Sequence, residues 1–177
     1  MYDFKNVETN NGIVYLEPGL HDVKVEAVVA DIPDGKSPKI AITFTNGNGS
    51  TVQNFYMSEK ATPRTLENLK HVMAACSSEK EAETVKGADL TTLAEAIGGL
   101  IIGKECSIKL RGEFYNGNLR AKFGFAPFAT AKGEGLLKFN PATDIEKDTS
   151  GDMIEGLGAP AMTGGDALPE AIEPEFG

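Results

Sequence analysis

The sequence predicts a mainly β domain with a helical region between its third and fourth strands, followed by an acidic tail. Five segments alternate apolar and polar residues with the period of a strand, and one region between them has the period of a helix. The composition then changes at residue 141. Residues 141–177 contain nine acidic residues and one basic residue, so they carry most of the formal net charge of −9, whereas residues 1–140 are nearly neutral.

The first strand is expected over residues 12–16 and 20–31, with a Glu-Pro-Gly turn between the two parts. In its second part, four apolar residues recur at every other position and are expected on one buried face: Val23, Val25, Ala27 and Val29.

The second and third strands are expected to form a hairpin. Ile40, Ile42 and Phe44 alternate with outward residues in the second strand, and an Asn-Gly-Asn-Gly turn over residues 46–49 favours pairing with a third strand over residues 51–57. The alternation leaves the buried face of the third strand open. One parity buries Val52 and Tyr56, and the other buries Phe55 and Met57.

Helical periodicity begins at residue 62, where a threonine precedes a proline suited to the first turn. Five residues at helical spacing are expected on its buried face: Leu66, Leu69, Val72, Met73 and Cys76. After a polar stretch, Asp89 is expected to cap a second helix that ends at Gly98 and Gly99. Its apolar residues are Leu90, Leu93, Ala94 and Ile97.

The last two strands, residues 104–114 and 119–126, are expected to form a hairpin that turns on Asn116 and Gly117. This turn sets a register in which the two apolar faces coincide. The expected pairs are Leu110 with Phe123, Ile108 with Phe125, and Phe114 with Leu119.

Three strands, a helical region and two further strands is the element order of an OB-fold, a small five-stranded Greek-key barrel. We therefore expect an OB-like barrel over residues 1–140, with its helical insert between strands 3 and 4, and a flexible, disordered acidic tail over residues 141–177. An all-β sandwich and a half-open sheet with a helical insert are alternatives that fit the same pattern.

Basic residues gather on the outer face of the last hairpin. The expected register places Arg111 opposite Lys122, with Lys109 and Arg120 nearby, and like charges opposite each other destabilise a strand pair. Only Glu113 offers relief within the hairpin. The stripe is interpreted either as a surface that a polyanion neutralises, or as a solvated face paired with acids such as Glu26 or with the protein's own tail.

A surface that binds single-stranded nucleic acid also needs exposed aromatic rings on which bases stack. The candidates are Phe114 and Tyr115 at the hairpin tip, and whichever of Phe55 and Tyr56 points outward. Phe128, just beyond the last strand, is a further candidate, and Lys39 on the second strand is included as an outward cation. Phe44, Phe123 and Phe125 are expected in the core.

No catalytic constellation is found, so we expect a protein that is not an enzyme and uses neither a cofactor nor a metal. His21 and His71 are far apart in sequence, and the two cysteines, Cys76 and Cys106, are expected to be buried reduced thiols. Three features favour a cytoplasmic location without a membrane partner. The thiols are expected to be reduced, the polar N-terminus lacks the basic-then-apolar pattern of a signal peptide, and no apolar run is long enough to span a membrane.

The acidic tail has two expected roles. A tethered polyanion can occupy a basic groove weakly and be displaced by nucleic acid, and once displaced it can recruit partner proteins. The residues expected to contact partners are Asp166, Glu170, Glu173, Glu175 and Phe176. Alternatively, the tail confers solubility only.

In these features the chain resembles the single-stranded DNA-binding proteins encoded by bacteriophages, which join an OB-fold body to an acidic tail. The resemblance covers nearly the whole chain: five strand segments, the insert over residues 62–97, the basic hairpin around residues 115–118, and the tail ending Glu-Pro-Glu-Phe-Gly. It implies coating of exposed strands during replication and recombination, and recruitment of polymerase, helicase or nuclease partners. Many such tails end in an aromatic residue, whereas here Gly177 follows Phe176.

The expected function is therefore binding and protection of single-stranded DNA in the cytoplasm of the host cell. A homo-oligomer is compatible with the sequence. No residue is recognisable as a contact for the 2′-hydroxyl group that distinguishes RNA from DNA. One alternative is a non-enzymatic phage structural or assembly protein whose acidic arm docks on a neighbouring subunit, with the apolar residues 136–139 as a docking strand. Another is an inhibitor that mimics DNA with its acidic arm and blocks a host nuclease.

Overall fold

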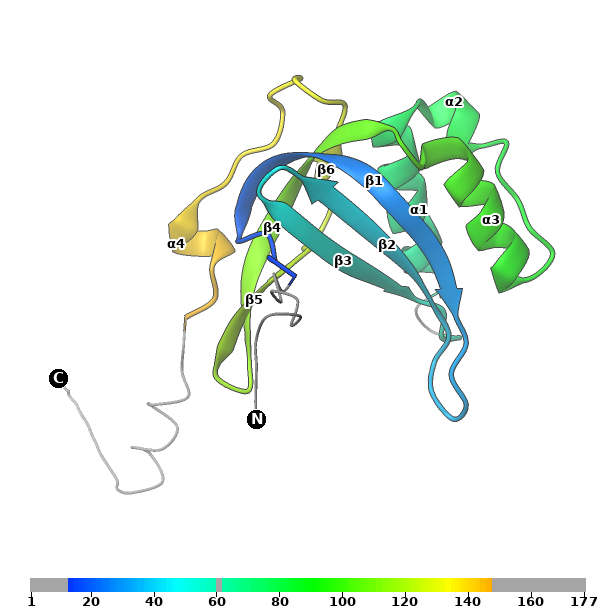
Figure 1. The fold of residues 1–177 in the computed structure, drawn as a ribbon, viewed down its shortest axis with the longest axis horizontal. Helices are drawn as coiled ribbons and strands as arrows, with labels where there is room; N and C mark the ends of the chain where they lie inside the picture. Colours follow the sequence, from blue (N-terminus) through cyan, green and yellow to red (C-terminus); the bar gives the residue numbers. More distant parts are fainter. Residues whose placement is uncertain (1–12, 60–61, 148–177) are drawn as a thin grey trace, which may run out of the picture. The chain divides into compact units, whose positions relative to one another are not determined.

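The computed structural model describes residues 13–59 and 62–147 (Figure 1). Residue contacts divide the chain into two units, which are described separately. The first consists of Met1–Arg111 and Ala121–Asp144, and the second of Gly112–Arg120 and Ile145–Gly177. Most of the expected acidic tail, residues 148–177, lies outside the described residues.

The strands form one sheet, which confirms the mainly β class. They are β1 (Gly19–Asp31), β2 (Lys39–Asn46), β3 (Gly49–Tyr56), β4 (Glu105–Tyr115), β5 (Asn118–Lys122) and β6 (Ala129–Thr130). The order is β3-β2-β1-β4-β5, with β6 paired to β4. The long, curved β1 is shared, because residues 24–31 pair with β2 and residues 19–24 with β4, both antiparallel (Figure 1). This path is open, with β3 and β5 at its ends.

A β-bulge in β1 overturns part of the expected buried face. Val23 and Val25 are buried as expected, but the register against β2 shifts between Val25 and Ala27. One extra residue reverses the parity of a strand. Val28 and Ala30 therefore pack against the core, and Val29 is 55 % exposed.

The hairpin of β2 and β3 has the expected inward face and resolves the open register. Ile40, Ile42 and Phe44 are fully buried. On β3 the parity that buries Phe55 is the one adopted, with Phe55 6 % and Tyr56 47 % exposed. Phe55 is thus part of the core and is not available to stack a base, while Tyr56 lies on the outer face.

Three helices follow β3 in the chain: α1 (Thr62–Cys76), α2 (Glu79–Ala82) and α3 (Leu90–Ile101). Asp89 caps α3 with a capping box to Thr92, as expected. Two expectations are wrong. Leu66 on α1 is 46 % exposed, and α3 continues beyond Gly98. Gly98 therefore lies within the helix, where a Cβ would be in ordinary contact with Val28 of β1, at 3.6 Å.

The turn of the last hairpin is confirmed, since Asn116 and Gly117 both have positive φ, at 52° and 79°. The second strand is shorter than expected, however, because β5 ends at Lys122. Ile108 pairs with Ala129 of β6 and not with Phe125, which is 82 % exposed and outside the core.

Phe128, and not Phe125, is the aromatic residue that the chain beyond β5 contributes to the core. It is 2 % exposed, and its ring stacks on that of Phe123 at 4.4 Å between centroids. Phe128 is therefore no candidate for base stacking. Phe123 also contacts the rings of Phe44 and Phe55, at 5.5 and 6.3 Å, so its expected inward position is confirmed.

A buried glutamine connects β3 with the chain that follows β5. Gln53 is 4 % exposed, and its Oε1 accepts a hydrogen bond of 2.9 Å from the Phe123 backbone N–H. Its Nε2 donates to Thr51 Oγ1 at 2.7 Å. Both polar groups of this buried side chain are thereby satisfied, which avoids the cost of an unpaired amide.

His71 joins α1 to the segment before β6. Its Nε2 accepts hydrogen bonds from the backbone N–H groups of Phe128 and Ala129, at 3.1 and 3.2 Å. Burial lowers the pKa of His71 below its ordinary value of 6.5. The ring is thus held neutral, with its proton on Nδ1.

Cys76 and Cys106 are free thiols, the first partly and the second fully buried. A hydrogen bond with Cys76 and burial together raise the pKa of Cys106. Among residues 13–59 and 62–147, no helix has the length and apolar character needed to cross a membrane.

The His71 contacts predict a dependence of stability on pH. Because the folded-state pKa is lowered, the unfolded chain binds more protons, so this contribution is complete above about pH 6.5 and is lost as the pH falls below it. Replacing His71 by glutamine should cost about 1–2 kcal/mol at pH 7.5 and make the unfolding free energy depend less on pH between 7.5 and 5. Denaturant unfolding at several pH values measures both effects, and equal pH dependence in the two proteins would contradict the role of His71.

Candidate nucleic-acid interface

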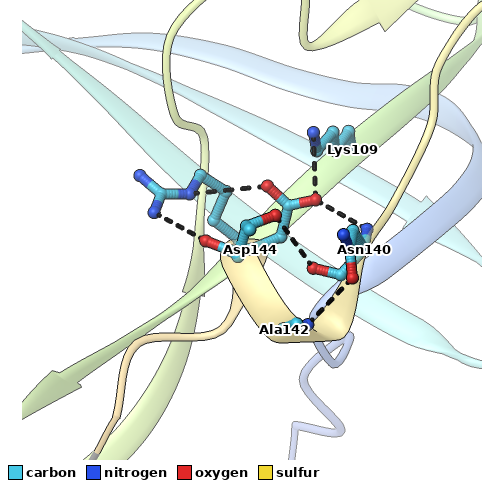
Figure 2. Close-up of polar contacts among 6 residues, drawn as sticks. Lys109, Asn140, Ala142 and Asp144 are labelled. Atoms are coloured by element: carbon cyan, nitrogen blue, oxygen red, sulfur yellow. Dashed lines mark hydrogen bonds and ion pairs between the residues drawn. The ribbon is translucent and has the colours of Figure 1, made fainter.

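Two of the expected basic residues in the first unit hold a carboxylate. Lys109 Nζ lies 3.2 Å from Asp144 Oδ2, and Arg111 Nε lies 3.9 Å from Asp144 Oδ1 (Figure 2). Arg111 also donates a hydrogen bond of 3.4 Å to the Thr143 carbonyl. Asp144 is only 9 % exposed. The two alternate residues of β4 therefore form one anion-binding position.

A short helix, α4 (Pro141–Asp144), presents this carboxylate. Asn140 precedes it and acts as an N-cap, because its Oδ1 accepts from the Ala142 N–H at 3.0 Å (Figure 2). The Asn140 N–H in turn donates to Asp144 Oδ2 at 2.7 Å. Asp144 thus closes its own turn while it contacts the two cations.

These contacts favour the ionised form of Asp144. The hydrogen bond from the Asn140 backbone lowers the pKa of the carboxyl, and the contacts with Lys109 and Arg111 lower it further against the opposing effect of burial. The carboxylate is therefore charged at neutral pH, as a nucleic-acid phosphate is.

The segment between β6 and α4 brings the helix to this face. β6 is held to β4, and the Lys109 N–H donates to the Phe128 carbonyl at 2.8 Å. The chain then turns at Gly133 and Gly135, which have positive φ of 86° and 69°, and buries Leu137. The lining of one cavity shows that this segment lies against the outer face of β1 and β4: Leu20, His21, Asp22, Ser107, Thr130, Gly133, Gly135 and Leu137.

In the second unit, the expected hairpin residues form a separate group. The Arg120 guanidinium lies over the Tyr115 ring at 4.4 Å and 3.5 Å from Glu113 Oε2. Tyr115 is 57 % exposed, and Phe114 is partly exposed. An arginine stacked on an exposed tyrosine offers both a charge and a flat π-face.

The same unit contains the first residues after α4. Ile145 forms a parallel bridge with Gly112, and the Glu146 N–H donates to the Gly112 carbonyl at 2.9 Å. Glu146 Oε1 accepts from the Phe114 N–H at 3.0 Å.

Of the interpretations left open for the basic stripe, pairing with the protein's own tail is the one found for Lys109 and Arg111, because Asp144 belongs to the segment expected to be tail.

Lys39 and Tyr56 form a third group, on the outer face of β2 and β3. They are directly opposite in the register, and Lys39 Nζ lies 5.7 Å from the centre of the Tyr56 ring. Lys39 also lies 3.8 Å from an oxygen of Asp31. Lys122, the remaining expected cation, has an exposed side chain.

Sequence reasoning missed Asn140 and Asp144, because the acidic composition after residue 140 outweighed a local signal. An asparagine followed by proline is typical of a helix start, with asparagine as N-cap and proline at the first helical position. The expected partner-binding residues of the tail lie outside the described residues: Asp166, Glu170, Glu173, Glu175 and Phe176. Within residues 13–59 and 62–147, no group of His, Cys, Asp or Glu side chains could hold a metal ion.

No protein-family model matches the chain, and no curated protein is significantly similar to it in sequence.

The contacts of Asp144 predict how α4 is held. Asp144→Asn removes the charge that both cations share but keeps an acceptor for the Asn140 N–H, so amide hydrogen exchange of residues 140–146 should become about 2- to 10-fold faster, as expected for weak, partly exposed ion pairs. Mass spectrometry of exchange measures this.

Glu134→Gln is the matched control, because it makes the same change of charge at an exposed position between β6 and α4. Equal exchange in Asp144→Asn, Glu134→Gln and the unchanged protein would mean that the ion pairs do not hold the helix.

Proposed function

We propose that this protein binds and protects single-stranded DNA during replication or recombination, without catalysis, in the host-cell cytoplasm. One observation carries the proposal: Lys109 and Arg111 hold the carboxylate of Asp144 between them, at 3.2 and 3.9 Å. Cationic side chains that bind one oxyanion can bind another, and contacts with backbone phosphates provide most of the affinity of proteins for nucleic acid.

The finer architecture that we propose is an OB-like barrel with the helices α1–α3 as its insert. Its support is the order of elements, with three helices between β3 and β4, and the way that β1 is shared between β2 and β4. The hydrogen bond from the Phe123 backbone to Gln53 links the region beyond β5 with β3, the two ends of the sheet path. Small barrels of this kind commonly bind oligonucleotides.

The proposed contacts divide into charges and rings. Lys109, Arg111, Arg120 and Lys122 contact phosphates, with Lys39 as a further cation. Tyr115 and Tyr56 stack bases, and both are about half exposed, at 57 % and 47 %. Phe114 is partly exposed and flanks Tyr115. Two of these rings already have a cation beside them, which suits binding of a base together with its phosphate.

The acidic segment competes with DNA for the same cations under this proposal. Asp144 supplies the structural support, since it occupies Lys109 and Arg111 from within the chain. The acidic residues within 148–177 add to this competition. The same segment recruits replication or recombination proteins through Asp166, Glu170, Glu173, Glu175 and Phe176. The assembly role has weaker support, because one residue of the expected docking strand, Leu137, is buried within its own chain, although Leu136 is 67 % exposed.

The proposal predicts a defined salt dependence of binding. If four cations each neutralise one phosphate, the slope of log affinity against log salt for an oligothymidylate should be about −3, at about −0.7 for each contact. Lys109→Ala should make the slope less steep by about 0.7 units. Fluorescence anisotropy of a labelled strand and of its duplex, at several salt concentrations, measures both.

Lys80→Ala, which removes an exposed cation from α2, is the matched control and should leave the slope unchanged. Absence of binding to the single strand at low salt, or equal affinity for the duplex, would contradict the proposed function. Association without nucleic acid, detected by sedimentation, would then favour the assembly role.

Competition by Asp144 predicts tighter binding when its charge is removed. In the full-length chain, Asp144→Asn should increase the affinity for oligothymidylate about 2- to 10-fold, the range expected for displacing two weak ion pairs. Glu134→Gln should change it much less. If both variants bind with the same affinity, the effect is one of net charge and Asp144 does not occupy the site.

A further inference from the structure

The segment after β5 exposes an aromatic ring that no expected site includes. Phe125 is 82 % exposed, more than any other large apolar side chain of the described residues. A single exposed apolar residue is ordinary on a protein surface, so exposure alone assigns nothing. Its position relative to Arg111 gives it significance.

Gly124, the residue before Phe125, lies directly against the Arg111 side chain. A Cβ at Gly124 would be 2.3 Å from Cδ of Arg111, so any larger residue would force the side chain or the backbone to move. The backbone of the Phe125 segment is therefore in contact with the aliphatic part of Arg111. The other end of the same side chain faces Asp144 and Thr143.

Arg111 thus links two features that suit the two parts of one nucleotide. Its Nε, together with Lys109, faces the carboxylate that stands in the position of a phosphate. Its Cδ lies against Gly124, and the residue that follows Gly124 is Phe125, whose ring is exposed. Bases stack on such rings with little preference for sequence, because every base has a π-face.

We propose that these residues form a nucleotide subsite, in which the Phe125 ring stacks a base and the attached phosphate replaces the Asp144 carboxylate between Lys109 and Arg111. This subsite rests on the proposed function, and it adds to that function a position at which a base is bound. Gly124 is a positioning residue, because the lack of a Cβ leaves room for the Arg111 side chain beside the backbone that precedes Phe125.

The absence of tryptophan from the chain allows a direct test. Phe125→Trp introduces a single tryptophan, whose fluorescence is quenched when a base stacks on it. In the full-length protein, oligothymidylate should quench this signal in parallel with binding measured by anisotropy. Leu66→Trp, at a 46 % exposed position on α1, is the control and should report no saturable quenching.

Affinity provides the second measurement. Phe125→Ala should weaken binding to oligothymidylate about 5- to 150-fold, the range for loss of one stacked base, while Phe125→Tyr keeps a ring and should stay close to the unchanged protein. Gly124→Ala should also weaken binding, because its Cβ displaces Arg111.

The outcomes separate the two proposals. If the unchanged protein binds the strand, but Phe125→Trp is not quenched and Phe125→Ala keeps its affinity, the subsite is wrong and the proposed function stands. If the unchanged protein does not bind single-stranded DNA, the proposed function is wrong and the subsite is overturned with it.

Discussion

Two cations on one face of β4 share a single carboxylate, and the chain that follows β6 is arranged around this contact. Lys109 and Arg111 alternate along the strand, and both contact Asp144. The path of the chain after β6 serves this contact: Leu137 is buried, Asn140 caps α4, and the Asn140 N–H binds the same carboxylate. Partly exposed ion pairs alone contribute little to stability, so the hydrogen-bonded turn of α4 helps to hold the carboxylate in place.

A site built in this way is occupied yet exchangeable. The carboxylate accepts a hydrogen bond from the Asn140 N–H and ion pairs from two cations that a phosphate would also use. The helix that presents it, α4, is a single short turn. The buried contacts of the body lie elsewhere, in the Phe44, Phe123 and Phe128 cluster, in Gln53, and in the His71 contacts with β6. The contacts that hold the core and the contacts that hold Asp144 therefore involve different residues.

Local signals in the sequence predicted the local features well. The alternation of Ile40, Ile42 and Phe44 and the turn at Asn116 and Gly117 depend on neighbouring residues, and both are found. The bulge in β1 and the exposure of Phe125 depend on distant contacts, with β2 and with the return of β6 to β4, which no local pattern encodes. For the site, the sequence predicted the cations of β4 but not their partner, because Asp144 lies in a segment whose composition indicates a tail.

The most direct measurement of the exchange is a titration of the isotope-labelled, full-length protein with oligothymidylate, followed by the backbone amide resonances of Asn140 and Asp144. If a phosphate replaces the carboxylate, the Asp144 resonance should shift during the titration. The Asn140 resonance should move toward its position in the Asp144→Asn variant, because the Asn140 N–H loses its charged acceptor in both cases. Binding that leaves these two resonances unchanged would show that DNA uses another surface and would contradict the exchange at β4.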